Sequence, residues 1–239
     1  MERDHQNQTA RSEVKYIITT AEAYKISYFL QPFCRLDRHA STSRGYCVRS
    51  LYFDDAENSF LYDKINGIKD RIKIRIRTYL PESSVYKLEI KEKHHDYVSK
   101  WSVPVPVELL PDLINGTCGV DAENRILNRI ISTHQCSLLR PVVLVDYWRK
   151  AFLFFQGENP VRITIDSDVS SDVSHLDFFK PSPCAHRLLR PELAILEIKF
   201  RNRFPDRLRP AIQNLRALRS SFSKYALSRK FAVVPAFDM

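Results

Sequence analysis

Two neighbouring stretches decide the fold: RIKIRIRTYL at Arg71–Leu80 and VYKLEIKEK at residues 85–93. In both stretches charged and aliphatic residues alternate, and a period of two is typical of a β-strand with one polar and one apolar face. The segment PESS at residues 81–84 separates them and has the composition of a turn. The sequence therefore predicts an antiparallel hairpin whose polar face is rich in arginine and lysine.

Further strands of this kind are predicted on both sides of the hairpin. They lie at residues 11–18, 142–155, 161–166 and 194–200. Helices are predicted at residues 20–31, 56–65, most of 107–139, and 205–221. A loop rich in Ser, Asp and Pro is predicted at residues 167–191, and Asp54-Asp55 is interpreted as the cap of the helix that follows it. These elements predict an α+β fold.

Composition indicates one folded domain with an anionic partner. The chain has 239 residues, of which 44% are hydrophobic, so it can bury a core. Its formal net charge of +9 favours nucleic acid, a membrane surface or phosphate compounds as partners. Residues 1–10 are predicted to be a disordered leader, and residues 11–239 a single domain.

Several function classes are disfavoured by what the sequence lacks. The five cysteines form no CxxC pair, which fits a reducing compartment and disfavours a disulfide framework or a structural zinc site. The sequence shows no apolar signal segment and no stretch of about 18 apolar residues, so a cytoplasmic protein is expected. The five glycines form neither a P-loop nor a dinucleotide-binding motif.

Alternation places charged residues of each predicted strand on one face. Lys73, Arg75 and Arg77 share a face, as do Arg162, Thr164 and Asp166. A solvated face would explain one such strand. Repetition across several strands would oppose like charges, which is destabilising unless a polyanion lies between them. We therefore expect the sheet to curl into a barrel with a polar lumen, its apolar outer face covered by helices.

An ordered series of motifs resembles a known family. The motifs are RSEVKY (11–16), YCVRSLYFDD (46–55), NGIKDRIKIRIRTY (66–79), KLEIKEK (87–93), DYWRKAF (146–152), VRITID (161–166), ILEIKF (195–200) and SKYALS (223–228). Together they resemble the VTC domain (vacuolar transporter chaperone type) of the triphosphate tunnel metalloenzyme, or CYTH-like, superfamily. The resemblance spans residues 11–231.

The resemblance implies a closed eight-stranded antiparallel barrel, a tunnel with a basic lumen. It also implies an ATP-dependent polyphosphate polymerase that transfers the γ-phosphate of ATP to a growing chain with Mn²⁺ or Mg²⁺. The implied ligands are ATP, polyphosphate and pyrophosphate. A membrane-protein partner and the oligomeric state are not visible in the sequence.

The resemblance further implies a set of site residues. Those expected to act on the transferred phosphate are Arg75, Arg77, Lys87, Lys91, Arg149, Arg162, Lys199 and Lys224. Those expected to bind substrate are Lys15, Arg49, Lys73, Lys100 and Ser223. The metal is expected on Glu197, helped by Glu89 or Glu13.

Three alternative functions remain open. Hydrolases of the superfamily often carry a Glu-x-Glu-x-Lys first strand, and Arg11 replaces the first Glu here, which disfavours an inorganic triphosphatase. A protein that binds polyphosphate without catalysis fits the same residues. A nucleic-acid-binding module is not expected, because Glu13, Glu89 and Glu197 lie among the basic residues and few aromatic residues are available for base stacking.

Overall fold

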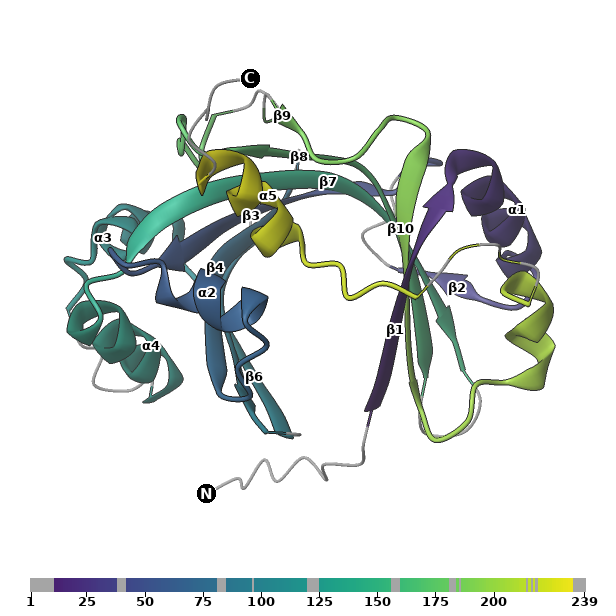
Figure 1. The fold of residues 1–239 in the computed structure, drawn as a ribbon, viewed down its shortest axis with the longest axis horizontal. Coiled ribbons are helices and arrows are strands. Elements are labelled where there is room, and N and C mark those ends of the chain that lie inside the picture. The colour runs from purple at the N-terminus through teal and green to yellow at the C-terminus, as the bar shows by residue number, and fades with distance from the viewer. Residues whose placement is uncertain are drawn as a thin grey trace. The chain divides into compact units, whose positions relative to one another are not determined.

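The computed structural model describes residues 11–37, 42–80, 85–95, 97–119, 125–155, 160–180, 184, 186–213, 215, 217 and 219–233. The strands are β1 (Arg11–Thr19), β2 (Arg35–Leu36), β3 (Tyr46–Asp54), β4 (Arg71–Leu80), β5 (Tyr86–His94), β6 (Tyr97–Val105), β7 (Arg140–Phe154), β8 (Val161–Asp172), β9 (His186–Arg187) and β10 (Leu193–Arg201). The α-helices are α1 (Thr20–Leu30), α2 (Ser59–Ile65), α3 (Leu110–Asn115), α4 (Arg125–Cys136) and α5 (Lys224–Val233), and the 3₁₀ helices are η1 (Val107–Leu109) and η2 (Asp206–Ala211) (Figure 1).

The strands form an antiparallel sheet, which confirms the predicted α+β class. Eight strands are hydrogen-bonded in the order β1-β10-β8-β7-β3-β4-β5-β6, while β2 pairs with β7 and β9 with β8. Over the described residues this path has two ends, β1 and β6, and the strands number ten. The prediction of a closed eight-stranded barrel is therefore wrong. Alternation along a strand fixes its faces, whereas closure depends on pairing between the two end strands, which no local pattern encodes.

Contacts divide the chain into two compact units. The first unit comprises Met1–Tyr46, Trp148–Asp168 and Leu189–Phe222. The second unit comprises Cys47–Tyr147, Val169–Leu188 and Ser223–Met239. Strands β7 and β8 contribute residues to both units.

The core of the first unit lies on the apolar face of β1, β10 and β8. Ile163 on β8 and Leu196 on β10 pack in one cluster with Ile26 and Leu30 of α1 and Leu208 of η2. Helix α1 lies beside β1 (Figure 1) and begins with a capping box, in which the Thr19 side chain accepts from the Glu22 amide and the Glu22 carboxylate accepts from the Thr19 amide. These helices cover the apolar face, as the sequence predicts for this part of the sheet.

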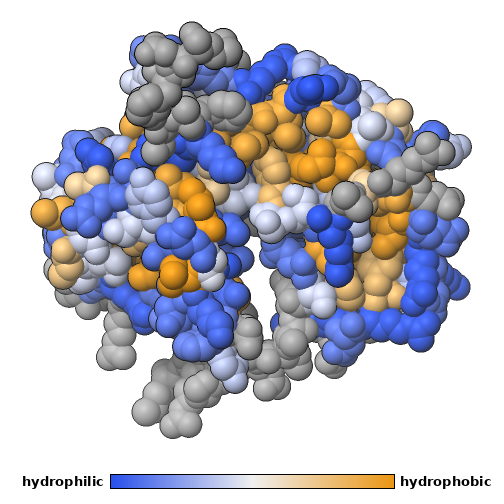
Figure 2. All heavy atoms as spheres, in the orientation of Figure 1, coloured by the Kyte–Doolittle hydropathy of each residue, from blue (hydrophilic) through white to orange (hydrophobic). Residues whose placement is uncertain are grey.

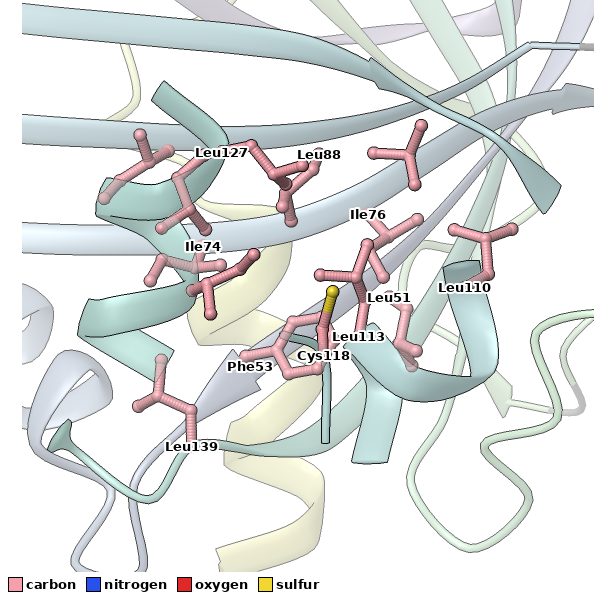
Figure 3. Packing of buried hydrophobic residues seen from close by; sticks show 14 of the residues in the cluster. Leu51, Phe53, Ile74, Ile76, Leu88, Leu110, Leu113, Cys118, Leu127 and Leu139 are labelled. Atoms are coloured by element: carbon pink, nitrogen blue, oxygen red, sulfur yellow. The ribbon is translucent and has the colours of Figure 1, made fainter. Parts of the chain in front are cut away.

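The core of the second unit is built in the same way. Ile74 and Ile76 of β4 and Leu88 of β5 pack against Leu113 of α3 and Leu127 of α4 (Figure 3). The facing residues of β3, Leu51 and Phe53, belong to the same cluster. The aliphatic residues of the predicted hairpin thus form a buried layer, which leaves its charged residues on the opposite face.

One strand was missed, and two predicted segments differ from the structure. Strand β6 was not predicted, because Pro104 interrupts its pattern; proline is tolerated there since β6 ends the hydrogen-bonded path. The predicted loop at 167–191 is wrong at its start, where β8 continues to Asp172 and pairs with β9. The predicted helix at 205–221 is reduced to η2, which contains Pro210, and the described residues between Ala211 and Ser221 are not helical.

Other predicted elements are confirmed by α1, by η1, α3 and α4, and by α2, although α2 begins at Ser59 and its N-cap is Asn58. The predicted capping role of Asp54 is nevertheless seen in the first turn of α2. Asp54 accepts hydrogen bonds from the backbone amides of Phe60 and Leu61 at 3.0 and 3.1 Å. The predicted leader at residues 1–10 lies outside the described residues. Hydrophilic residues cover much of the face seen in Figure 2, and in the described part of the chain no helix has the length and apolarity needed to cross a membrane.

Candidate functional site

The second unit carries a dense set of cations on the face opposite its core. Strand register places Lys73 opposite Lys91, Arg75 opposite Glu89 and Arg77 opposite Lys87. On the next strand Lys100 lies opposite Lys91. We call this set the basic cluster, and its members are Lys73, Arg75, Arg77, Lys87, Lys91 and Lys100. The predicted sharing of one face by the charged residues of β4 and β5 is confirmed.

Glu89 is the internal counter-ion of the basic cluster. Its carboxylate accepts from Arg75 Nε at 2.6 Å and from Lys100 Nζ at 2.7 Å, and Arg77 Nη1 lies 3.7 Å away. Burial would raise the pKa of Glu89, but Arg75, Arg77 and Lys100 hold it well below its usual range. Because both oxygens of Glu89 contact cations, a metal bound there would have to displace them.

Tyr52 of β3 lies beside the same arginines. It is opposite Arg75 in the strand pairing, and its hydroxyl accepts from Arg75 Nη1 at 3.0 Å. The Lys73 ammonium lies 5.5 Å from the centroid of the Tyr52 ring. Burial opposes ionisation of this phenol, yet Arg75, Lys73 and Arg77 lower the pKa of Tyr52 to about 7. The cluster thus holds a second group, after Glu89, that can be an anion.

Helix α5 brings the SKY motif to the basic cluster. Lys73 Nζ lies 3.5 Å from Ser223 Oγ, and Lys224 Nζ lies 4.4 Å from the centroid of the Tyr147 ring. The Tyr147 hydroxyl is also 3.5 Å from Arg77 Nη2. The helix is anchored by Tyr225, whose hydroxyl donates to Asp54. Ser223 and Lys224 therefore belong with the arginines of β4, although they are distant in sequence.

Arg49 is not part of the basic cluster. It pairs with Thr78 in the strand register, one residue out of phase with Ser50 and Arg77, so it lies on the other face of the sheet. Its side chain is 1% exposed and donates to both carboxylate oxygens of Asp146 at 2.9 and 2.8 Å. The predicted substrate-binding role conflicts with this burial, and the structure indicates that Arg49 stabilises the fold.

In the first unit, carboxylates and cations alternate on the face opposite the core. Glu13 of β1 lies opposite Lys199 of β10, and Lys15 lies opposite Glu197. On the other side of β10, Thr164 and Arg162 of β8 lie opposite Glu197 and Lys199. We call these six residues the mixed-charge cluster. Register between neighbouring strands confirms the predicted polar faces.

Ion pairs link the mixed-charge cluster. Lys15 Nζ is 2.9 Å from Glu13 Oε1, Lys199 contacts Glu197, and Lys199 Nζ is 3.9 Å from Glu13 Oε2. Burial would raise the pKa of Glu197, but Lys199, Lys15 and Arg149 hold it well below its usual range. The pKa of Glu13 is also lowered: burial and Glu197 oppose its ionisation, but Lys199 and Lys15 outweigh them. Both glutamates are therefore ionised oxygen donors at neutral pH.

The two predicted arginines of the first unit each hold a carboxylate. Arg149 donates to both oxygens of Asp166 at 2.7 and 2.8 Å, and Arg162 donates to Asp37 Oδ2 at 2.9 Å. A guanidinium that makes a bidentate contact with a carboxylate has the geometry to make the same contact with a phosphate.

The acidic residues permit a divalent metal but do not enclose one. In the described ranges no group of three or more His, Cys, Asp or Glu residues could hold a metal ion. Glu13 and Glu197 form a pair on adjacent strands. Mg²⁺ in phosphoryl-transfer sites is usually held by one or two carboxylates together with phosphate oxygens, and this pair fits that donor set.

Sequence reasoning missed several participants. Tyr52, Asp37 and Asp166 contact the predicted arginines but were not predicted as site residues. The sequence did contain a signal for Tyr52. It lies two residues after Ser50 and two before Asp54 in a strand-like run, so the three residues share one polar face. Asp37 carried none, because its contact with Arg162 joins positions 125 residues apart.

The fold and the two clusters define a class: an antiparallel α+β protein with charged residues gathered on one face of its sheet. The model of the VTC domain matches residues 10–233, so the chain belongs to the VTC domain family.

Two solved structures are similar to this chain. A candidate adenylate cyclase from Bacillus halodurans is 11% identical with a TM-score of 0.45, and the match covers 84% of each chain. The PH1819 protein from Pyrococcus horikoshii OT3 is 12% identical with a TM-score of 0.45, and the match covers 92% of this chain and 99% of that one. No curated protein matches the sequence.

Proposed function

We propose that this protein is an ATP-dependent polyphosphate polymerase, which transfers the γ-phosphate of ATP to the end of a growing polyphosphate chain. The observation that carries the proposal is the opposition of like charges in the basic cluster, Lys73 with Lys91, Lys91 with Lys100, and Arg77 with Lys87. Directly opposed cations destabilise a sheet, and a bound polyanion removes that repulsion. Membership of the VTC domain family supports a phosphoryl-transfer function.

Phosphoryl transfer between phosphates requires alignment and charge neutralisation more than acid–base chemistry. Arginines suit bidentate contacts with non-bridging oxygens, and lysines act as point charges. In the proposal the former role belongs to Arg75, Arg77, Arg149 and Arg162. The latter belongs to Lys87, Lys91, Lys199 and Lys224. Substrate is further bound by Lys15, Lys73, Lys100 and Ser223.

Glu197 and Glu13 are the residues that would hold the divalent metal, Mn²⁺ or Mg²⁺. When bound, such an ion neutralises charge on the phosphate oxygens. Glu89 is a less suitable ligand, because Arg75 and Lys100 contact its two oxygens at 2.6 and 2.7 Å, whereas Lys15 and Lys199 lie 2.9 and 3.9 Å from those of Glu13. We therefore assign Glu89 the role of holding the arginines of the basic cluster in place.

An inorganic triphosphatase is the second candidate. The observation in its favour is the adjacency of two ionised carboxylates, Glu13 and Glu197, on one sheet face. Hydrolysis would use the same phosphate ligands and differ in the acceptor, which would be water in place of a terminal phosphate.

The test is a polyphosphate gel of the purified protein with ATP, Mn²⁺ and pyrophosphate as primer. We expect a ladder that is lost in Glu197→Gln and retained in the control Glu108→Gln, which makes the same charge change at an exposed site in η1. A full ladder from Glu197→Gln would disprove its metal role. Orthophosphate released from tripolyphosphate without a ladder would establish the triphosphatase, and salt-sensitive binding without turnover would establish a binding protein.

A further inference from the structure

Thr164 of β8 has a buried hydroxyl with no hydrogen-bond partner. The residue is 4% exposed, and its Oγ1 belongs to the few buried side-chain oxygen and nitrogen atoms without a partner within the described residues. Buried polar groups are nearly always hydrogen-bonded, because desolvation without a partner is unfavourable. Packing alone would be better served by valine, which has the same shape, so the hydroxyl calls for an explanation.

The position of Thr164 points to that explanation. It lies directly opposite Glu197 in the ladder between β8 and β10, so both side chains are on the charged face of the first unit. On the next strand Lys15 is opposite Glu197, and Glu13 lies two residues before Lys15 on the same face. The unpartnered hydroxyl is thus directed to the face that carries the carboxylate pair.

The described side chains around Thr164 give its hydroxyl no hydrogen bond, and two carboxylates lie on the same face of the sheet. The nearest carboxylate on its own strand and face, Asp166, is bound to Arg149 through both oxygens. Glu13 and Glu197 supply two carboxylates, and no third His, Cys, Asp or Glu among the described residues completes a metal site with them. A hard divalent cation prefers oxygen donors and accepts a neutral hydroxyl among them, as the serine or threonine of a P-loop shows with Mg²⁺.

We propose that Thr164 Oγ1 is the third protein oxygen ligand of a divalent cation held by Glu13 and Glu197. The inference rests on the metal-binding role of these glutamates in the proposed function and adds a residue to it. This assignment explains why a hydroxyl is present where the fold gives it no hydrogen-bond partner, because its partner is the bound cation.

The test uses Mn²⁺ alone, titrated into the full-length protein and followed by the electron paramagnetic resonance signal of the free ion. We expect Thr164→Val to weaken Mn²⁺ binding about tenfold or more, and Thr164→Ser, which keeps the hydroxyl, to recover most of the loss. The matched control is Thr78→Val, since Thr78 is equally buried but donates to the Val85 carbonyl at 3.2 Å.

Thermal unfolding of the same variants gives a second readout. Removing the unpartnered hydroxyl in Thr164→Val should leave the melting temperature unchanged or higher, whereas Thr78→Val should lower it by a few degrees without altering Mn²⁺ binding. Unchanged Mn²⁺ affinity in Thr164→Val, together with a loss in Glu197→Gln, would overturn this inference alone. Unchanged affinity in Glu197→Gln would overturn the metal site of the proposed function.

Discussion

Tyr52 shows how strongly the basic cluster acts on a single residue. Its hydroxyl accepts a hydrogen bond from Arg75, and its ring lies 5.3 Å from that of Tyr225, centroid to centroid. Burial would favour the neutral phenol, but Arg75, Lys73 and Arg77 lower the pKa of Tyr52 to about 7. A phenolate is therefore the favoured form of this residue in the folded protein at mildly alkaline pH.

The lowered pKa of Tyr52 predicts how the stability of the fold depends on pH. The folded pKa of about 7 lies below the ordinary value of 10.0, so folding releases a proton between these two values. The stabilisation is absent below about pH 7, grows as the pH rises, and is complete above about pH 10. We expect the free energy of unfolding of wild type, measured with denaturant and taken relative to that of Tyr52→Phe, to increase by a few kcal/mol between about pH 6 and about pH 9.

Near-ultraviolet absorbance checks the same group directly. Wild type should show one phenolate titrating near neutral pH, and Tyr52→Phe should lack it. A stability difference between the two proteins that is constant with pH, or shrinks as the pH rises, would contradict the assignment.

At the scale of elements, β4, β5 and β6 form a ladder under electrostatic strain. Lys91 has a cation opposite it on both sides, Lys73 on β4 and Lys100 on β6. We expect tripolyphosphate to raise the melting temperature by more than sodium chloride of equal ionic strength does, because it binds the folded state selectively. Thermal unfolding followed by fluorescence measures the melting temperature in each of the two salts.

The variant Lys91→Gln distinguishes repulsion between opposed lysines from the effect of the net charge on stability. Without ligand it should melt at a higher temperature than wild type, and tripolyphosphate should raise its melting temperature less. Lys25→Gln, on the exposed side of α1, makes the same charge change away from the sheet and should leave both values as in wild type. Equal effects of the two substitutions would show that net charge, and not the opposed pairs, governs stability.

Strands with regular alternation and the helices α1 to α4 were predictable, whereas strand β6 and the end of β8 were not. The charged and apolar faces of β4, β5 and β10 follow from a period of two, and the packing of Ile74 and Leu88 against α3 and α4 confirms them. The predicted helix at 205–221 failed although Leu208, Ile212 and Leu215 do pack in the core, because Pro210 and the 3₁₀ geometry of η2 override the helical spacing. The face on which Arg49 lies was not predictable, because membership in a motif does not determine which face of β3 a residue occupies.

For the whole molecule, the net charge of +9 predicts strongly salt-dependent binding. The logarithm of the association constant for labelled polyphosphate should fall linearly with the logarithm of salt concentration, since bound cations release counterions from the polyanion. Lys91→Gln should reduce the slope by about one. Fluorescence anisotropy over a salt series measures the slope, and salt-independent affinity would exclude the basic cluster as the binding surface.

Single-stranded DNA of equal charge provides the comparison. We expect it to bind more weakly, because Glu13, Glu89 and Glu197 repel a backbone whose phosphates are widely spaced, and the cluster offers few rings for base stacking. Equal or tighter binding of DNA would favour the nucleic-acid alternative. The sequence could predict this preference for phosphate chains from charge and motif, but the open sheet path depends on which strands pair across long separations.

The position of Glu89 has a consequence for transport. A resident carboxylate competes with each arriving phosphate for Arg75, Arg77 and Lys100, so no single phosphate is held at full strength. Along a repeating chain, every departing phosphate is replaced either by its neighbour or by Glu89, and the cations never lose a counter-ion. Conduction through a multi-site filter relies on the same balance between entry and release. If the proposed function holds, Glu89 lowers the energy barrier for moving the product along the basic cluster while the product remains bound.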